Sequence, residues 1–187
     1  MWTVELAQPE RMGELMAVPS RFLVDRRLVV EGGKVVGQKA VDPPYVKDYD
    51  AFTGDQVSDW PRVFQVASWA LFLARSPKGV LVGGAIVAAK DNTVDLLESR
   101  DDLAHVFDIR VHPDHQGQGL GRRLWEEACR WCASQGITEL RVETQDVNVA
   151  ACAFYAAMGC RIHKVDPLAY PVEMGETQVI WSLDLTK

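Results

Sequence analysis

A glycine-rich segment, Gln116-Gly117-Gln118-Gly119-Leu120-Gly121-Arg122, has residue types and spacing suited to binding an anion. It lies between a predicted strand that ends at Val111 and a predicted helix that begins at Leu120. The first amides of a helix have no intrahelical acceptor and carry a partial positive charge. Glycines let the backbone close around an anion at that point, so the segment predicts a pyrophosphate site.

Two common phosphate-binding loops do not fit this spacing. A Rossmann loop needs a third glycine where Arg122 stands, and the open series of parallel strand-helix units is missing. A P-loop needs Gly-Lys-Ser/Thr, which does not occur. A merely flexible connection is disfavoured, because three alternating glycines cost conformational entropy unless their backbone is used.

The flanking elements follow from hydrophobic periodicity. Residues 105–111 alternate as a strand, which predicts that His105, Phe107, Ile109 and Val111 share one face while Asp108 lies on the other. After the loop, apolar residues recur at helical spacing until Gly136, which predicts an amphipathic helix.

The rest of the chain predicts an α/β fold with a mixed sheet. We expect a hairpin at 28–36, a loop over 42–50, paired strands at 67–74 and 80–89, a polar loop at 90–102, a strand at 137–144, a helix capped by Asn148 and ended by Gly159, and a last strand at 178–185.

At this point the residues resemble a known family. Val111-x-Pro113-x-x-Gln116-x-x-Gly119-x-Gly121 resembles the acyl-CoA signature of the GNAT superfamily of N-acyltransferases, and Asn148-x-x-Ala151-x-x-Phe154-Tyr155-x-x-x-Gly159 resembles its next helix. The likeness covers residues 65–185. Within the superfamily, residues 142–148 together with 42–50 are similar to streptothricin acetyltransferases, although Cys160 stands where an aromatic residue usually follows Gly159.

The resemblance implies a mostly antiparallel central sheet flanked by helices, with acetyl-CoA as cosubstrate. It implies a substrate-side segment over residues 1–64 and an acetyl-CoA-binding core over 65–187 of the same domain. The residues expected to bind the cosubstrate are Ile109, Arg110, Val111, Gln116, Gly117, Gln118, Gly119, Gly121, Arg122, Asn148 and Tyr155. A backbone N–H of residues 109–111 would stabilise the oxyanion.

The chemistry needs a base, because an alkyl ammonium group has a pKa near ~10.4 and must lose a proton before the nitrogen attacks a thioester. Glu143 matches a carboxylate that some relatives use, and His105 is the alternative; either could instead be structural. Asp108 is expected to bind the substrate ammonium. Tyr155 matches the tyrosine that relatives place beside the CoA sulfur as general acid.

Composition bounds the remaining choices. The net charge of −6 and the lack of a Lys/Arg cluster argue against nucleic acid and are compatible with a cationic amine. No apolar run is long enough for a membrane span, and the opening residues lack a secretory signal, which predicts a cytoplasmic protein. The four cysteines are interpreted as small buried apolar residues, with no metal site expected.

The function predicted from these residues is transfer of an acetyl group from acetyl-CoA to a primary amine of a small cationic substrate, such as a streptothricin-like antibiotic. The alternatives are acetylation of a protein lysine or N-terminal amine, and a non-catalytic CoA-binding regulator. The resemblance also suggests a homodimer.

Overall fold

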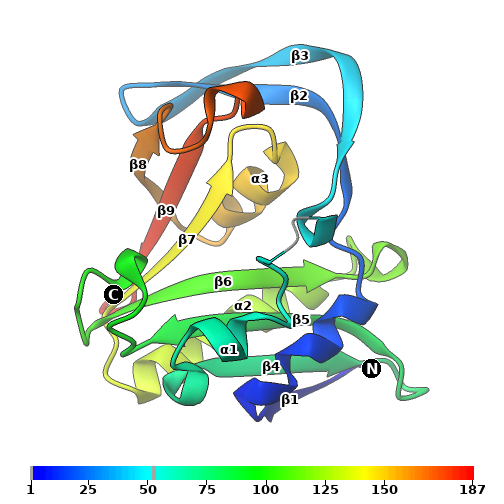
Figure 1. The fold of residues 1–187 in the computed structure, drawn as a ribbon, viewed down its shortest axis with the longest axis vertical. Helices are drawn as coiled ribbons and strands as arrows, with labels where there is room; N and C mark the ends of the chain where they lie inside the picture. Colours follow the sequence, from blue (N-terminus) through cyan, green and yellow to red (C-terminus); the bar gives the residue numbers. More distant parts are fainter. Residues whose placement is uncertain (1, 52–53) are drawn as a thin grey trace. The chain divides into compact units, whose positions relative to one another are not determined.

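The computed structural model describes residues 2–51 and 54–187, which form two compact units built from interleaved parts of the chain (Figure 1). Of the described residues, the first unit comprises 2–21, 48–51, 54–140 and 185–187, and the second comprises Phe22–Lys47 and Arg141–Asp184. Neither unit begins or ends at residue 64. Residues 1–64 are divided between the two units, and their substrate-side role stays a prediction.

The first unit contains four strands in the order β1-β4-β5-β6, and each adjacent pair is antiparallel. Their bounds are β1 (Thr3–Ala7), β4 (Ala70–Arg75), β5 (Leu81–Ala89) and β6 (Leu103–Val111). The predicted hairpin of two apolar strands is confirmed as β4 and β5. Strand β1 was not predicted, because it is short and largely exposed and so lacks a clear alternation.

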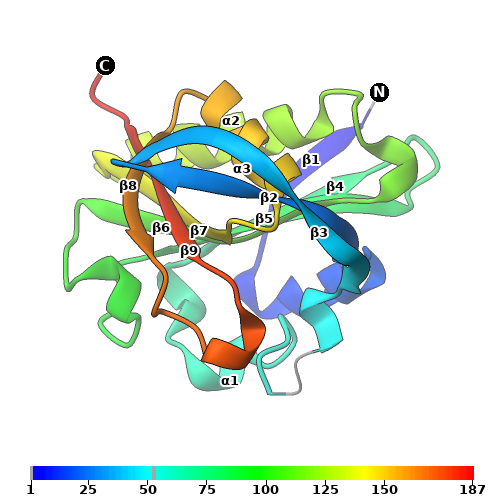
Figure 2. The same cartoon turned by 90° about the horizontal axis from the view of Figure 1, so that it is seen from above.

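Helices cover both faces of these strands. Helix α2 (Leu120–Ser134) contacts β4, β5 and β6, and α1 (Trp60–Val63) lies on the opposite side of them (Figure 2). The α1 side also carries the 3-10 segments η1 (Pro9–Ala17) and η3 (Val66–Ser68). The apolar core on that side includes Met12, Leu15, Trp60, Trp69, Leu71 and Ile86. The amphipathic helix predicted after the glycine segment is therefore confirmed.

Strand β6 contains a β-bulge that changes which residues share a face. Asp108 pairs with Ile86 and Val106 pairs with Val87, so Phe107 is an extra residue on β6. Adjacent residues of β5 point to opposite faces, and Asp108 and Val106 therefore do so as well. The predicted alternation is wrong beyond Phe107: His105 shares its face with Asp108 and not with Ile109.

The second unit combines a long hairpin with three strands and a helix. The hairpin pairs β2 (Phe22–Glu31) with β3 (Lys34–Lys47). The other strands lie in the order β7-β9-β8, and α3 contacts β2. Their bounds are β7 (Glu139–Gln145, mostly in this unit), α3 (Val149–Ala157), β8 (Arg161–Asp166) and β9 (Gln178–Asp184). The predicted α/β class with mostly antiparallel strands flanked by helices is confirmed.

Two expectations for the second unit were wrong. Part of the predicted loop, residues 42–47, belongs to β3, although pairing with β2 is interrupted between Ala40 and Tyr45. Pro43 and Pro44 lie in this interruption and have no backbone N–H to donate, which explains why the residues looked like a loop. Strand β8 was also missed, because its largely polar and exposed residues carry little hydrophobic signal.

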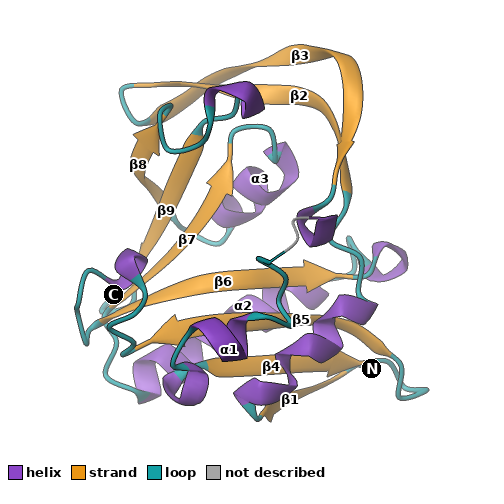
Figure 3. Ribbon diagram, viewed as in Figure 1, coloured by secondary structure: helices purple, strands orange, loops and turns teal. Residues whose placement is uncertain are grey.

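Short 3-10 segments separate the regular elements (Figure 3). The remaining ones are η2 (Tyr49–Ala51), η4 (Asp95–Leu97), η5 (Pro113–His115) and η6 (Val172–Met174). Among the described residues, none of the helices combines the length and the apolar character needed to cross a bilayer.

Candidate active site

The predicted anion-binding loop has the local geometry that such a site requires. Gly117 and Gly119 have φ angles of 70° and 92°, and Gly119 is the N-cap of α2. Apart from each glycine and its two neighbours in the chain, no heavy atom of the described residues lies within 4 Å of the position that a Cβ would take at Gly117 or Gly119. The backbone is therefore open to an approaching group, and the first turn of α2 supplies amides that need an acceptor. These residues fit a pyrophosphate.

Two glutamines brace this loop. The Gln116 side-chain amide donates to the carbonyl of Val111 at 2.9 Å, and the Gln118 amide donates to the carbonyl of Asp114 at 2.9 Å. Both side chains are thus used to hold the loop's shape, so any contact they make with a ligand would come through the backbone or the remaining polar atoms. Binding of a cosubstrate by Gln116, Gln118, Gly121 and Arg122 stays a prediction.

Arg110 is held inside the first unit. Its guanidinium contacts Asp108 at 2.6 Å, Asp50 at 2.8 Å and the carbonyl of Val18 at 3.1 Å, and its side chain is 6% exposed. This partner set occupies the guanidinium. The predicted role of Ile109, Arg110 and Val111 toward the cosubstrate therefore rests on their backbone and not on the Arg110 side chain.

Asp108, the predicted ammonium ligand, already has a cationic partner. Burial raises the pKa of its carboxyl group, and the neighbouring Arg110 guanidinium opposes that rise. Asp108 and Asp50 together bring one negative charge more than Arg110 neutralises. Recognition of an ammonium group by Asp108 stays a prediction, and it would have to compete with this ion pair.

His105 lies in an apolar environment. It is 2% exposed, its ring is 5.7 Å from that of Phe107, and its Nδ1 lies 3.2 Å from the carbonyl of Val106. This packing favours the structural interpretation of His105. Its role as the base stays a prediction.

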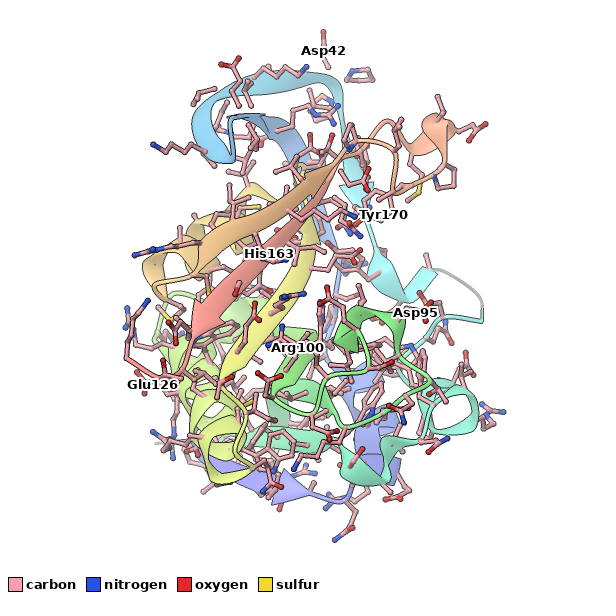
Figure 4. The ribbon with its side chains drawn as sticks, turned by 90° about the vertical axis from the view of Figure 1, so that its left-hand side faces the viewer. Asp42, Asp95, Arg100, Glu126, His163 and Tyr170 are labelled. Carbon is pink, nitrogen blue, oxygen red and sulfur yellow. The ribbon has the colours of Figure 1, made fainter. Side chains whose placement is uncertain are left out.

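Glu143 lies in the second unit within a group of neutral hydrogen-bond donors. The Tyr170 hydroxyl donates to Glu143 Oε1 at 2.6 Å, and the Gln178 amide donates to Oε2 at 2.8 Å. Gln145, two residues further along β7, donates to the Tyr170 oxygen at 3.0 Å. Tyr170 lies in the segment between β8 and β9 (Figure 4).

Tyr170, Gln178 and Gln145 were not predicted. Gln145 could have been found, because alternate residues of a strand share a face and Gln145 lies two positions after Glu143. Tyr170 and Gln178 carry no such signal, since they reach Glu143 from 27 and 35 residues away in the chain.

Helix α3 carries the remaining predicted residues of the second unit. The Asn148 side chain accepts a hydrogen bond from the Ala151 amide at 3.1 Å, so the predicted N-cap is confirmed. Tyr155 is buried in the same helix, with its ring 5.4 Å from that of Phe154 in an edge-on arrangement. Their contacts with a cosubstrate stay predictions.

The fold and these residues agree with the comparisons to known proteins. Residues 39–160 match the model of the acetyltransferase (GNAT) family, and the chain belongs to that family. It is similar to a streptothricin acetyltransferase of Escherichia coli, with 28% identity over 92% of this chain and 91% of that protein.

Two solved structures have the same fold. A nourseothricin acetyltransferase superposes with a TM-score of 0.74 at 23% identity, covering 98% of both chains. A Bacillus anthracis protein described as a streptothricin acetyltransferase, in complex with acetyl coenzyme A, has a TM-score of 0.74 at 22% identity and covers 98% of this chain and 99% of its own. The predicted GNAT fold is confirmed.

Proposed function

We propose that this protein transfers the acetyl group of acetyl-CoA to a primary amine of a small cationic substrate of the streptothricin kind. The observation that carries the proposal is the Glu143 carboxylate, partly buried and held by two neutral donors, Tyr170 and Gln178. The similarity to a streptothricin acetyltransferase along nearly the whole chain supports the substrate class.

Glu143 supplies the base that the reaction needs. A substrate ammonium with a pKa near ~10.4 is almost fully protonated at neutral pH, so its nitrogen has no lone pair for attack. Neutral donors hold the Glu143 carboxylate without cancelling its charge, which leaves it able to attract the ammonium and to accept its proton directly or through water.

The first unit supplies the acyl-CoA side of the reaction. Bound acetyl-CoA contributes the activated thioester, and the open glycine backbone before α2 would hold its pyrophosphate. A backbone N–H of residues 109–111 would stabilise the negative charge that forms on the carbonyl oxygen when the amine attacks.

Tyr155 completes the scheme at the departing sulfur. A phenol with an ordinary pKa near ~10 is a weaker acid than a thiol near ~8.5, so full proton transfer to the thiolate is uphill by about 2 kcal/mol. We therefore assign Tyr155 mainly a hydrogen-bonding role, which stabilises the thiolate as the carbon–sulfur bond breaks.

Thiol release from acetyl-CoA tests this function. Wild-type protein is assayed against streptothricin, polyamines and lysine peptides, with binding of acetyl-CoA measured separately. Acetylated streptothricin, identified by its mass, is the expected product. Turnover only of lysine peptides would replace the proposed substrate class, and binding of acetyl-CoA without any turnover would favour a non-catalytic CoA-binding protein.

A further inference from the structure

Both carboxylate oxygens of Glu143 are held in place by hydrogen bonds. Tyr170 reaches Oε1 at 2.6 Å and Gln178 reaches Oε2 at 2.8 Å. The shorter distance is typical of a hydroxyl donating to an ionised carboxylate. Two donors on two oxygens restrict rotation of the carboxylate, so its direction is set by residues outside its own strand.

The direction of the Tyr170 hydrogen bond is also determined. The Gln145 amide donates to the Tyr170 oxygen at 3.0 Å, and an amide nitrogen can only donate. The phenolic oxygen acts as the acceptor in that bond, which leaves its proton for Glu143. Gln145, Tyr170 and Glu143 thus form a chain of hydrogen bonds that runs in one direction.

Two other acidic residues of the second unit, Asp146 and Glu176, have cationic partners. Asp146 pairs with Arg27 at 2.6 Å, and Glu176 pairs with Lys47. The Arg27–Asp146 pair joins the β2–β3 hairpin to the residue that follows β7, and the Lys47–Glu176 pair joins it to the chain that precedes β9. Within the described part of the chain the partners of Glu143 are neutral, so its position is fixed while its negative charge stays available.

The segment that carries Tyr170 is anchored on both sides. Before Tyr170, the Leu168 amide donates to Asp166 at 2.9 Å. After it, the Gly175 carbonyl accepts from Arg27 at 2.7 Å and the Thr177 amide donates to Asp146 at 2.9 Å. The charged pairs of the second unit therefore hold the segment that brings Tyr170 to Glu143.

We propose that Tyr170 and Gln178 are positioning residues that hold the Glu143 carboxylate in the direction needed to accept the proton of the substrate ammonium. The inference rests on the proposed function for the role of Glu143 as the base. Tyr170 acts through Glu143, so its hydroxyl should matter only while the carboxylate is present.

A double-mutant cycle tests this dependence. Tyr170→Phe removes the hydroxyl and keeps the ring, Glu143→Gln removes the charge, and the double variant combines them. With streptothricin as acceptor, Tyr170→Phe should lower kcat about 10- to 100-fold, as expected for a lost hydrogen bond to a charged group, while KM for streptothricin changes less than about threefold. In the Glu143→Gln background the same change should have less than about a twofold effect.

Gln178→Leu, which removes the second donor, should show the same dependence on Glu143. Val172→Ala is the matched control, because Val172 lies in the same segment and its side chain is 86% exposed. That variant should retain wild-type kcat and KM. An equal loss from Tyr170→Phe with and without the Glu143 carboxylate would show that Tyr170 acts only through folding, and would overturn the proposal.

Absence of acetyltransferase activity in the wild-type protein would be a separate result. If wild-type protein acetylates none of the amines, the proposed function fails. The four proteins of the double-mutant cycle, which are wild type, Tyr170→Phe, Glu143→Gln and the double variant, are then compared by urea unfolding. Non-additive stabilities of Tyr170→Phe and Glu143→Gln would keep Tyr170 as the residue that orients Glu143. Additive stabilities would show that the pair is uncoupled and would reject the positioning role as well.

Discussion

The acidic side chains of this protein differ in the kind of partner that each has. Asp108 contacts Arg110, and Glu176 contacts Lys47 in addition to the Tyr45 hydroxyl, whereas the hydrogen bonds that Glu143 accepts come from a phenol and an amide alone among the described residues. Removing one partner of a buried ion pair destabilises the fold, because the remaining charge is left buried without compensation. A carboxylate held by neutral donors keeps its charge for another group, which agrees with the role we propose for Glu143.

A substitution at Arg110 tests whether its ion pairs with Asp108 and Asp50 stabilise the fold. Arg110→Met leaves Asp108 and Asp50 without their shared cation, and we expect a loss of roughly 3 to 5 kcal/mol in the free energy of unfolding. Arg62→Met is the control, because the Arg62–Asp59 pair lies at the surface with Arg62 77% exposed, and exposed pairs contribute about 1 kcal/mol or less. Urea denaturation of both variants measures the difference. Equal losses would contradict the structural role of Arg110.

Substitutions at Tyr155 and Glu143 test the catalytic roles that we propose for these two residues. Tyr155→Phe should lower kcat about 10- to 100-fold and leave the Kd of acetyl-CoA nearly unchanged, because the lost interaction stabilises charge that forms only as the thiolate departs. Glu143→Gln should lower kcat roughly 100-fold or more, since a base is lost. Steady-state kinetics and calorimetry separate these effects. Wild-type turnover by Tyr155→Phe would refute the assignment of Tyr155.

At the scale of elements, α2 and α3 each combine a polar N-terminal end with a side of buried residues. Helix α2 begins directly after the open glycine backbone, and Leu120, Leu124 and Cys132 are buried on its apolar side. Helix α3 begins at the Asn148 cap and buries Cys152 and Tyr155. The interpretation of these cysteines as small apolar residues agrees with their burial.

Burial of the thiols on these helices disfavours their charged form. It raises the pKa of Cys129 to about 11 and that of Cys132 and Cys152 to about 12. A raised thiol pKa favours the protonated form, so at pH 8 only about 0.1% or less of each is the reactive thiolate, against roughly a quarter for a free cysteine near 8.5.

Iodoacetamide labelling followed by peptide mass analysis checks this expectation. At pH 8, modification of Cys129, Cys132 and Cys152 in the folded protein should be at least about 100-fold slower than in urea. Each rate should rise as the pH approaches 11 to 12 while the protein stays folded. Cys129 is only partly buried, and rapid labelling of it in folded protein at pH 8 would contradict the raised pKa of its thiol. Slow labelling also means that these thiols add little background to a thiol-release assay.

At the scale of the whole molecule, the chain passes repeatedly between its two compact units. The predicted acyl-CoA loop with Gly119 belongs to the first unit, while Glu143 and Tyr155 belong to the second. Binding of acetyl-CoA to the folded protein should be visible as a gain in the stability of the folded chain, because a ligand that binds only the native state shifts the unfolding equilibrium.

Acetyl-CoA at about 100 times its Kd should stabilise the wild-type protein by about 2.7 kcal/mol. Gly119→Ala should reduce this gain at the same acetyl-CoA concentration, because its φ of 92° is unfavourable for alanine and the new methyl group would narrow the open backbone. Gly79→Ala is the matched control: Gly79 has a φ of 78° in the β4–β5 turn, with no heavy atom of the described residues near its Cβ position.

Urea unfolding with and without acetyl-CoA compares the two glycine variants. Both should be less stable than wild type without the ligand, since both place alanine in a left-handed conformation. Only Gly119→Ala should lose part of the ligand-dependent gain. An undiminished gain in Gly119→Ala would show that this loop does not bind the cosubstrate.

The sequence by itself determined the features that depend on neighbouring residues. The glycine segment, the apolar periodicity of α2 and the Asn148 cap all follow from local spacing, and the structure has each of them where expected. Helical periodicity and capping depend on residues within about one turn of one another, so a single sequence is enough to find them.

Only the tertiary structure decided the features that depend on distant residues. The bulge at Phe107 moved Asp108 to the face of His105, and it depends on the register with β5. The pairing of Arg110 with Asp50, and of Tyr170 with Glu143, joins residues 60 and 27 positions apart. No local pattern encodes such contacts, because they exist only after strands and loops that are far apart in the chain have packed together.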